Sequence, residues 1–103
     1  MSFGKYKLND DGTVEPFTDV IEWAGWYETA SNRQIALDDV GDVRISTVFL
    51  SIDHSFGGDG PPILFETMIF PAGEILDRYS TAKQALAGHR AYVRLEKEKL
   101  HRV

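Results

Sequence analysis

The sequence predicts a single α+β domain over residues 1–103, in which an antiparallel sheet of about four to five strands packs with two helices, in the order β-α-β-β-β-β-α. Two apolar runs rich in β-forming residues lie at 43–53 and 63–70. Two segments with a helical spacing of apolar residues, 19–30 and 81–100, flank them. A chain of 103 residues is long enough for one domain and too short for two ordinary ones.

Five segments of the chain predict strands. They are residues 3–8, 33–40, 43–53, 63–70 and 74–79, separated by turn signals rich in Gly, Pro, Asn and Asp. In 43–53 and 63–70, both alternating faces become apolar toward the middle of the run. This pattern is typical of strands covered on both faces, so we expect these two segments to lie side by side in the interior of the sheet.

Residue types that cap helices precede both helical segments. Thr18 or Asp19 can cap the first helix, and Thr81, with Gln84 three residues later, forms the pattern of a capping box for the second. The second helix is amphipathic. Its predicted inner stripe is Ala82, Ala85, Leu86, His89, Val93 and Leu100, and its outer stripe is Lys83, Arg90, Arg94, Lys97 and His101.

Charge is divided unevenly along the chain. Residues 1–80 carry 5 basic and 14 acidic groups, whereas residues 81–103 carry 6 basic and 2 acidic groups, and the whole chain has a net charge of −5. An acidic body opposes nonspecific phosphate binding, so we do not expect a nucleic-acid partner. The basic end, with Arg90 and Arg94, is free to contact an acidic partner or the acidic body of the same chain.

Three further absences in the sequence limit the class of protein. The chain has no cysteine, which excludes disulfides and cysteine-ligated metals and agrees with a cytoplasmic location. No window approaches 18 uninterrupted apolar residues, and residues 1–10 lack the apolar core of a signal peptide. We therefore expect no membrane span, and no residue pattern calls for a cofactor.

Asp53 and His54 end the first central run and are candidate catalytic residues. A histidine at the end of a strand can act as a general base or as a metal ligand. The alternative is that Asp53 accepts hydrogen bonds from the backbone of the following loop, with His54 packed at the rim of the sheet.

The loop at 55–62 contains three glycines and two prolines, and its candidate binding residues are Phe56, Gly57, Gly58 and Asp59. Phosphate-binding turns need a helix directly after the glycines, but here Pro61-Pro62 and a predicted strand follow. A structural loop is therefore expected, in which the glycines allow positive φ and the prolines stiffen the chain. The alternatives are a mobile lid over a pocket and a contact surface formed by this loop.

Glu66 interrupts the apolar run 63–70 and is a third catalytic candidate. A buried carboxylate needs a partner, for which Arg44 and Arg78 on neighbouring strands are suitable, and a structural ion pair is one expectation. The other is a ligand-binding patch on one face of the sheet, formed by Glu66 with Ser46, Thr47, Ser51 and Thr67.

His89 falls on the inner stripe of the second helix. A core histidine that bonds a backbone or hydroxyl group is one interpretation. A three-group site of His54, His89 and Glu66 is the other, and it matches zinc ligands in residue type only.

Trp23, Trp26 and Tyr27 lie within five residues of one helix and cannot all point inward. Trp26 is the one expected to be partly exposed or to pack on a partner subunit, which would favour a homodimer. The alternative is that the N-terminal strand or Phe17 covers it.

The run STVFLSIDHSFGGDGPPILFETMIF, followed by Asp77-Arg78-Tyr79-Ser80-Thr81 and then by Ala85 and Gly88-His89, is similar to a family of small phage and prophage proteins. The similarity covers about residues 41–89. This chain differs from the family at Pro71-Ala72-Gly73-Glu74, where members have a glycine-rich link. The resemblance implies a phage context and no particular activity.

These observations favour a non-enzymatic accessory protein of the phage type. It would act in the cytoplasm of the bacterial host by binding a host protein or a small ligand, for example as an inhibitor of bacterial immunity. A small histidine-based or metal-dependent hydrolase and a structural virion component are the alternatives.

Overall fold

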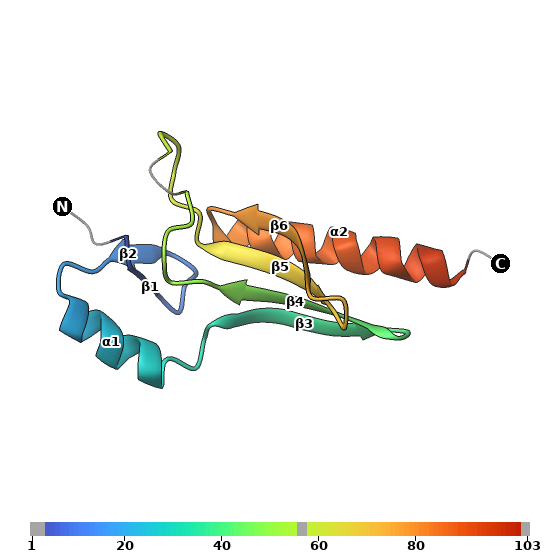
Figure 1. Ribbon diagram of the computed structural model, residues 1–103, viewed down its shortest axis with the longest axis horizontal. Helices are drawn as coiled ribbons and strands as arrows, with labels where there is room; N and C mark the ends of the chain where they lie inside the picture. The colour runs from blue at the N-terminus through green and yellow to red at the C-terminus, as the bar shows by residue number, and fades with distance from the viewer. Residues whose placement is uncertain (1–3, 56–57, 102–103) are drawn as a thin grey trace.

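In a computed structural model, which describes residues 4–55 and 58–101, the chain forms two helices and two antiparallel sheets (Figure 1). In chain order the elements are β1 (Tyr6–Leu8), β2 (Val14–Pro16), α1 (Val20–Thr29), β3 (Gln34–Val40), β4 (Val43–Phe49), β5 (Phe65–Phe70), β6 (Glu74–Tyr79) and α2 (Ala82–Leu100). The predicted α+β class and element order are confirmed, with β2 as one additional short strand.

The main sheet has four antiparallel strands in the order β3-β4-β5-β6. The two central segments lie side by side as predicted, with pairs that run from Arg44 opposite Phe70 to Phe49 opposite Phe65. Strand β4 ends at Phe49, earlier than expected, because the chain turns at Ser51, whose φ of 70° lies in the left-handed region.

A small hairpin of β1 and β2 lies at one end of the main sheet, together with α1 (Figure 1). Asp19 caps α1 by accepting a hydrogen bond of 2.8 Å from the backbone N–H of Ile21. The hairpin joins the loop after β4 through the backbone N–H of Tyr6, which donates to the carbonyl of Ser51 at 2.7 Å.

Helix α2 packs along one face of the main sheet and contacts all four of its strands. Its N-terminus has the predicted capping box, in which Thr81 and Gln84 satisfy each other's backbone N–H groups. The core lies between this helix, the sheet and the hairpin. Its buried residues are Leu8, Phe49, Leu64, Phe65, Tyr79 and Ala85.

The opposite face of the main sheet has no covering helix within residues 4–55 and 58–101, because α2 packs on the other face and α1 packs against β1. The expectation that 43–53 and 63–70 are covered on both faces is therefore wrong for the second face. Half-buried Val48 and Met68 and exposed Phe70 lie there. The two-sided apolar pattern is real, but residues 4–55 and 58–101 supply a covering layer on one face only.

Candidate functional site

A chain of polar side chains crosses the covered face of the sheet. His89, 2% exposed, places Nδ1 2.7 Å from Thr47 Oγ1 and Nε2 2.7 Å from Asp38 Oδ2. Thr47 Oγ1 lies 2.6 Å from Thr67 Oγ1, which in turn lies 3.0 Å from the Tyr79 hydroxyl. These five residues are called the Asp38–Tyr79 chain below.

The donors and acceptors of the Asp38–Tyr79 chain can be ordered in a single direction. In the tautomer in which His89 Nε2–H donates to Asp38, Nδ1 accepts from Thr47. Thr47 can then accept from Thr67, and Thr67 from Tyr79. Burial raises the pKa of Tyr79, which keeps its hydroxyl protonated as the first donor.

A carboxylate, an imidazole and a hydroxyl in a row resemble the groups that activate a nucleophile. Here the hydroxyl of Thr47 belongs to a fully buried side chain and also contacts Thr67. It is held inside the core, out of reach of a substrate. The geometry therefore agrees with the interpretation of His89 as a core histidine bonded to a hydroxyl group.

Asp53 holds the loop that follows it. Its Oδ1 accepts from the backbone N–H of Ser55 at 2.8 Å and of Ile63 at 2.9 Å, and its Oδ2 accepts from the Ser55 hydroxyl at 3.0 Å. Burial opposes ionisation of Asp53, but these hydrogen bonds and the nearby His54 outweigh it and lower its pKa. His54 Nδ1 lies 2.7 Å from the carbonyl of Ile52. Both residues thus make the structural contacts of the alternative interpretation.

Glu66 forms the expected ion pair with Arg78, with Nε and Oε2 2.9 Å apart, whereas Arg44 pairs with Asp39. The proposed polar patch does not exist, because Thr47 and Thr67 point to the covered face, while Glu66 alternates with them and points to the open face. Ser51 lies beyond the end of β4 and donates its hydroxyl to the carbonyl of Tyr6.

The three-group site of His54, His89 and Glu66 is also not formed. His89 lies on the covered face, Glu66 lies on the open face, and His54 lies in the loop after β4. Within residues 4–55 and 58–101, no three His, Asp or Glu side chains are grouped so that they could hold a metal ion.

The aromatic residues of α1 are all half-buried. Trp26 packs against Phe17 and Phe49, with ring centroids 6.0 Å from each, so Phe17 covers it as the alternative expected. Trp23 Nε1 donates to Ser51 Oγ at 2.8 Å. Helix α1 therefore uses its tryptophans to join the end of the main sheet.

The loop between β4 and β5 stands away from the sheet (Figure 1). Of its candidate binding residues, Gly58 and Asp59 are exposed. Phe56 and Gly57 lie outside the described residues.

Arg90 and Arg94 border a cleft of about 360 Å³ between α2 and β3, together with Lys97. None of the three makes an ion pair with another described residue. Asp38 of β3 faces them across the cleft and bonds His89 of α2. The cleft thus presents three free cations to solvent on an otherwise acidic protein.

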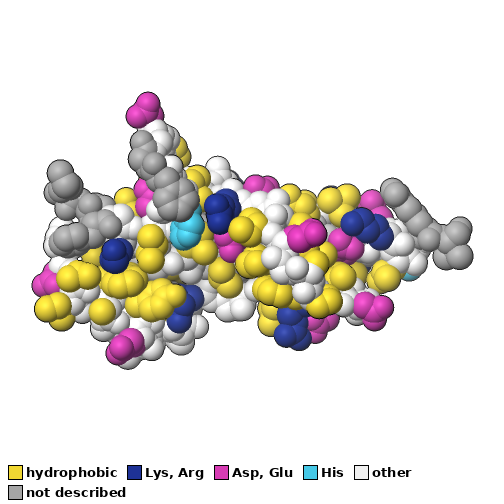
Figure 2. Space-filling view, viewed as in Figure 1, with side chains coloured by type: hydrophobic (Ala, Val, Ile, Leu, Met, Phe, Trp, Pro, Cys, Tyr) yellow, Lys and Arg dark blue, Asp and Glu magenta, His cyan; other side chains and the backbone are white. Residues whose placement is uncertain are grey.

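An apolar belt, which sequence reasoning missed, crosses the open face. Leu37 on β3 pairs with Ser46 on β4, Ser46 pairs with Met68 on β5, and Met68 pairs with Ile75 on β6. Leu37, Met68 and Ile75 are called the open-face belt below. In Figure 2, hydrophobic side chains lie over the sheet with basic and acidic side chains between them. Only the register of the four strands reveals this alignment.

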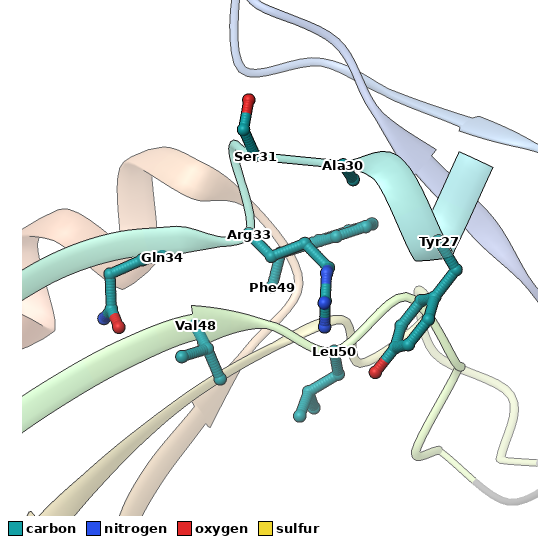
Figure 3. Close-up of a pocket in the computed structure, with 8 residues that line it drawn as sticks. All are labelled: Tyr27, Ala30, Ser31, Arg33, Gln34, Val48, Phe49 and Leu50. Atoms are coloured by element: carbon teal, nitrogen blue, oxygen red, sulfur yellow. The ribbon is translucent and has the colours of Figure 1, made fainter.

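A cavity of about 400 Å³ lies where α1 leads into β3, with Tyr27, Arg33 and Leu50 in its wall (Figure 3). The guanidinium of Arg33 stacks on the Tyr27 ring, with Cζ 4.0 Å from the ring centroid. Sequence reasoning missed Arg33 because nothing in its local pattern distinguishes it from an ordinary strand residue.

Comparisons of the chain with known protein families, curated proteins and solved structures found no match. The similarity of residues 41–89 to phage proteins therefore stays a prediction. Neither helix, over the residues that the structure describes, is both long and apolar enough to cross a membrane.

Proposed function

We propose that the protein acts by binding, as a homodimer whose two copies pack through the open face of the main sheet. The observation that carries this proposal is the open-face belt, whose apolar members lie on β3, β5 and β6 with Ser46 of β4 between them. No element within residues 4–55 and 58–101 covers it. Leu37 is 48% exposed, Ile75 is 49% exposed, and the neighbouring Phe70 is 39% exposed. Exposed apolar side chains gathered on one face of a sheet in this way are typical of interaction surfaces.

The charges beside the belt favour a second copy as its occupant. In the strand register, the Asp39–Arg44 pair lies on one side of the belt and the Glu66–Arg78 pair lies on the other. Each side thus carries one charge of each sign. In a two-fold dimer, the same surface of each copy faces the other copy. A surface with charges of one sign would repel its copy, whereas a surface with both signs can pair with itself. Two sheets stacked face to face would complete the missing layer.

Such a dimer leaves α2 on the outside, with Arg90, Arg94 and Lys97 facing solvent. We propose that these cations contact an acidic surface of a target protein, since opposite charge steers association. The resemblance to phage proteins suggests that this target is a bacterial host protein, and we propose inhibition of bacterial immunity as the role.

A charge placed on the belt tests the dimer. Ile75→Glu puts a carboxylate at an exposed position where it cannot disturb the core, so the fold is expected to be retained. Burying this charge in the interface should weaken self-association by at least about tenfold, because an unpaired buried charge is costly. Molar mass measured by light scattering over a range of concentrations should fall from that of two chains to that of one.

The matched control is Leu95→Glu, because Leu95 on α2 is also 49% exposed and lies away from the open face. It should associate like the original chain. An original chain that stays monomeric at high concentration, or equal effects of the two substitutions, would contradict the proposed interface.

A further inference from the structure

The cavity beside Arg33 has the features of a binding site for an anion. Among the described residues, Arg33 Nε is the single buried side-chain nitrogen or oxygen without a hydrogen-bond partner. Arg33 also makes no ion pair with any of these residues. The rest of the guanidinium borders the cavity, so an anion that enters the cavity meets a cation with no competing anion among these residues.

The guanidinium of Arg33 is held in place before any ligand arrives. The Tyr27 ring stands beside it, and in Figure 3 the tyrosine hydroxyl and the guanidinium both point toward Leu50. The backbone carbonyl of Arg33 accepts from the N–H of Phe49 at 2.7 Å, which fixes the start of β3 against the end of β4. A donor fixed in this way loses little freedom on binding.

The wall of the cavity indicates which kind of anion fits. Arg33 is the one charged side chain among its described lining residues, and Ala30, Val48 and Leu50 supply apolar surface. A guanidinium matches the planar fork of a carboxylate, and the apolar wall suits a hydrocarbon body. The volume of about 400 Å³ lies in the range of small-molecule sites.

We propose that this cavity binds a carboxylate carried on a small apolar body, with Arg33 as the residue that binds the carboxylate group. The carboxylate belongs either to a free organic acid or to the C-terminus of a peptide. The site lies beside α1 and does not depend on the proposed dimer.

Titration with benzoate, followed by nuclear magnetic resonance, tests the site directly. The Nε–H signal of Arg33 should shift in a saturable manner, together with the backbone amides of Ala30 and Leu50, with a dissociation constant in the millimolar range. Benzamide, which has the same shape but no charge, should leave these signals unchanged. No saturable shift with benzoate, or an equal shift with benzamide, would overturn the proposal.

Variants separate the charge of Arg33 from its geometry. Arg33→Lys keeps the charge but loses the fork and should weaken benzoate binding by about tenfold, whereas Arg33→Gln should abolish it. Tyr27→Leu should weaken binding by about two- to fivefold, since it removes the ring that holds the guanidinium. Lys83→Gln removes an exposed cation elsewhere and should bind like the original chain. Unchanged binding in Arg33→Gln would refute the role of this residue.

A second titration distinguishes the two sources of the carboxylate. The probes are acetyl-Ala-Ala-Phe with a free C-terminal carboxylate and the same peptide with a C-terminal amide. Tighter binding of the free peptide than of benzoate, with no binding of the amide, supports a peptide C-terminus. Binding of benzoate alone supports a free acid. Binding of both peptides with equal affinity would contradict carboxylate recognition.

Discussion

The two faces of the main sheet differ in which side chains they bury and which they expose. On the covered face, polar side chains lie in the interior, and the Asp38–Tyr79 chain gives each of them a partner. On the open face, apolar side chains of the open-face belt meet solvent, and the charged groups beside them form ion pairs. On the covered face, α2 supplies the second layer, whereas the part of the chain that the structure describes supplies no layer on the open face.

The largest effect is expected where α2 approaches the covered face most closely. A Cβ built on Gly88 would overlap the Tyr79 hydroxyl, which also bonds Thr67. Gly88→Ala should therefore lower the free energy of unfolding by about 2–3 kcal/mol, although alanine favours a helix. Urea denaturation measures this change.

The control for that prediction is the same substitution in the other helix. A Cβ on Gly25 of α1 meets no atom within 4 Å, so Gly25→Ala should raise the free energy of unfolding by about 0.5–1 kcal/mol. If Gly88→Ala were also stabilising, the close packing of α2 on the covered face would be wrong.

The two ion pairs of the open face should differ in how much they contribute to stability, and this difference should be smaller than the effect of Gly88→Ala. The side chain of Glu66 is 10% exposed and that of Arg78 is 36% exposed, whereas both members of the Asp39–Arg44 pair are exposed. Arg78→Gln leaves a buried carboxylate without its cation and should cost about 1–2 kcal/mol of stability, while Arg44→Gln should cost less than about 0.5 kcal/mol. Thermal denaturation of both variants checks the difference, and equal losses would contradict the burial of Glu66.

The third stability test concerns the loop after β4, where Asp53 accepts hydrogen bonds from the backbone N–H groups of Ser55 and Ile63. Its folded pKa lies below the ordinary value of 3.8, so its contribution to stability is complete above that pH and is lost as the pH falls through the folded pKa. Asp53→Asn should cost about 1 kcal/mol near neutral pH, and the gap to the original chain should narrow in acid. Urea denaturation at several pH values measures the gap, and a gap independent of pH would argue against an ionised Asp53 as the loop anchor.

Local patterns in the sequence predicted most of the helices and strands. Apolar runs of β-forming residues, bounded by turn signals, identified the strands around Thr47 and Thr67, and the Thr81–Gln84 spacing identified the start of α2. The unpredicted features depend on contacts between distant segments. Strand β2 is three residues long and ends in a proline, so it exists mainly because β1 pairs with it. The turn at Ser51 uses a conformation that sequence does not predict for serine.

The candidate sites were harder to predict than the fold for the same reason. Asp53 and Glu66 could be assigned structural partners because capping and ion pairing follow simple rules. The belt from Leu37 to Ile75 depends on the register of four strands. The stack of Arg33 on Tyr27 depends on how α1 leads into β3.

The central claim is that the open face, and not α2, joins two copies of the chain. Intermolecular nuclear Overhauser effects, recorded on a mixture of isotope-labelled and unlabelled chains, test it most directly. The methyl groups of Leu37, Met68 and Ile75 should show contacts between copies. Contacts at Leu95 on α2 instead, with none from the belt, would contradict the account.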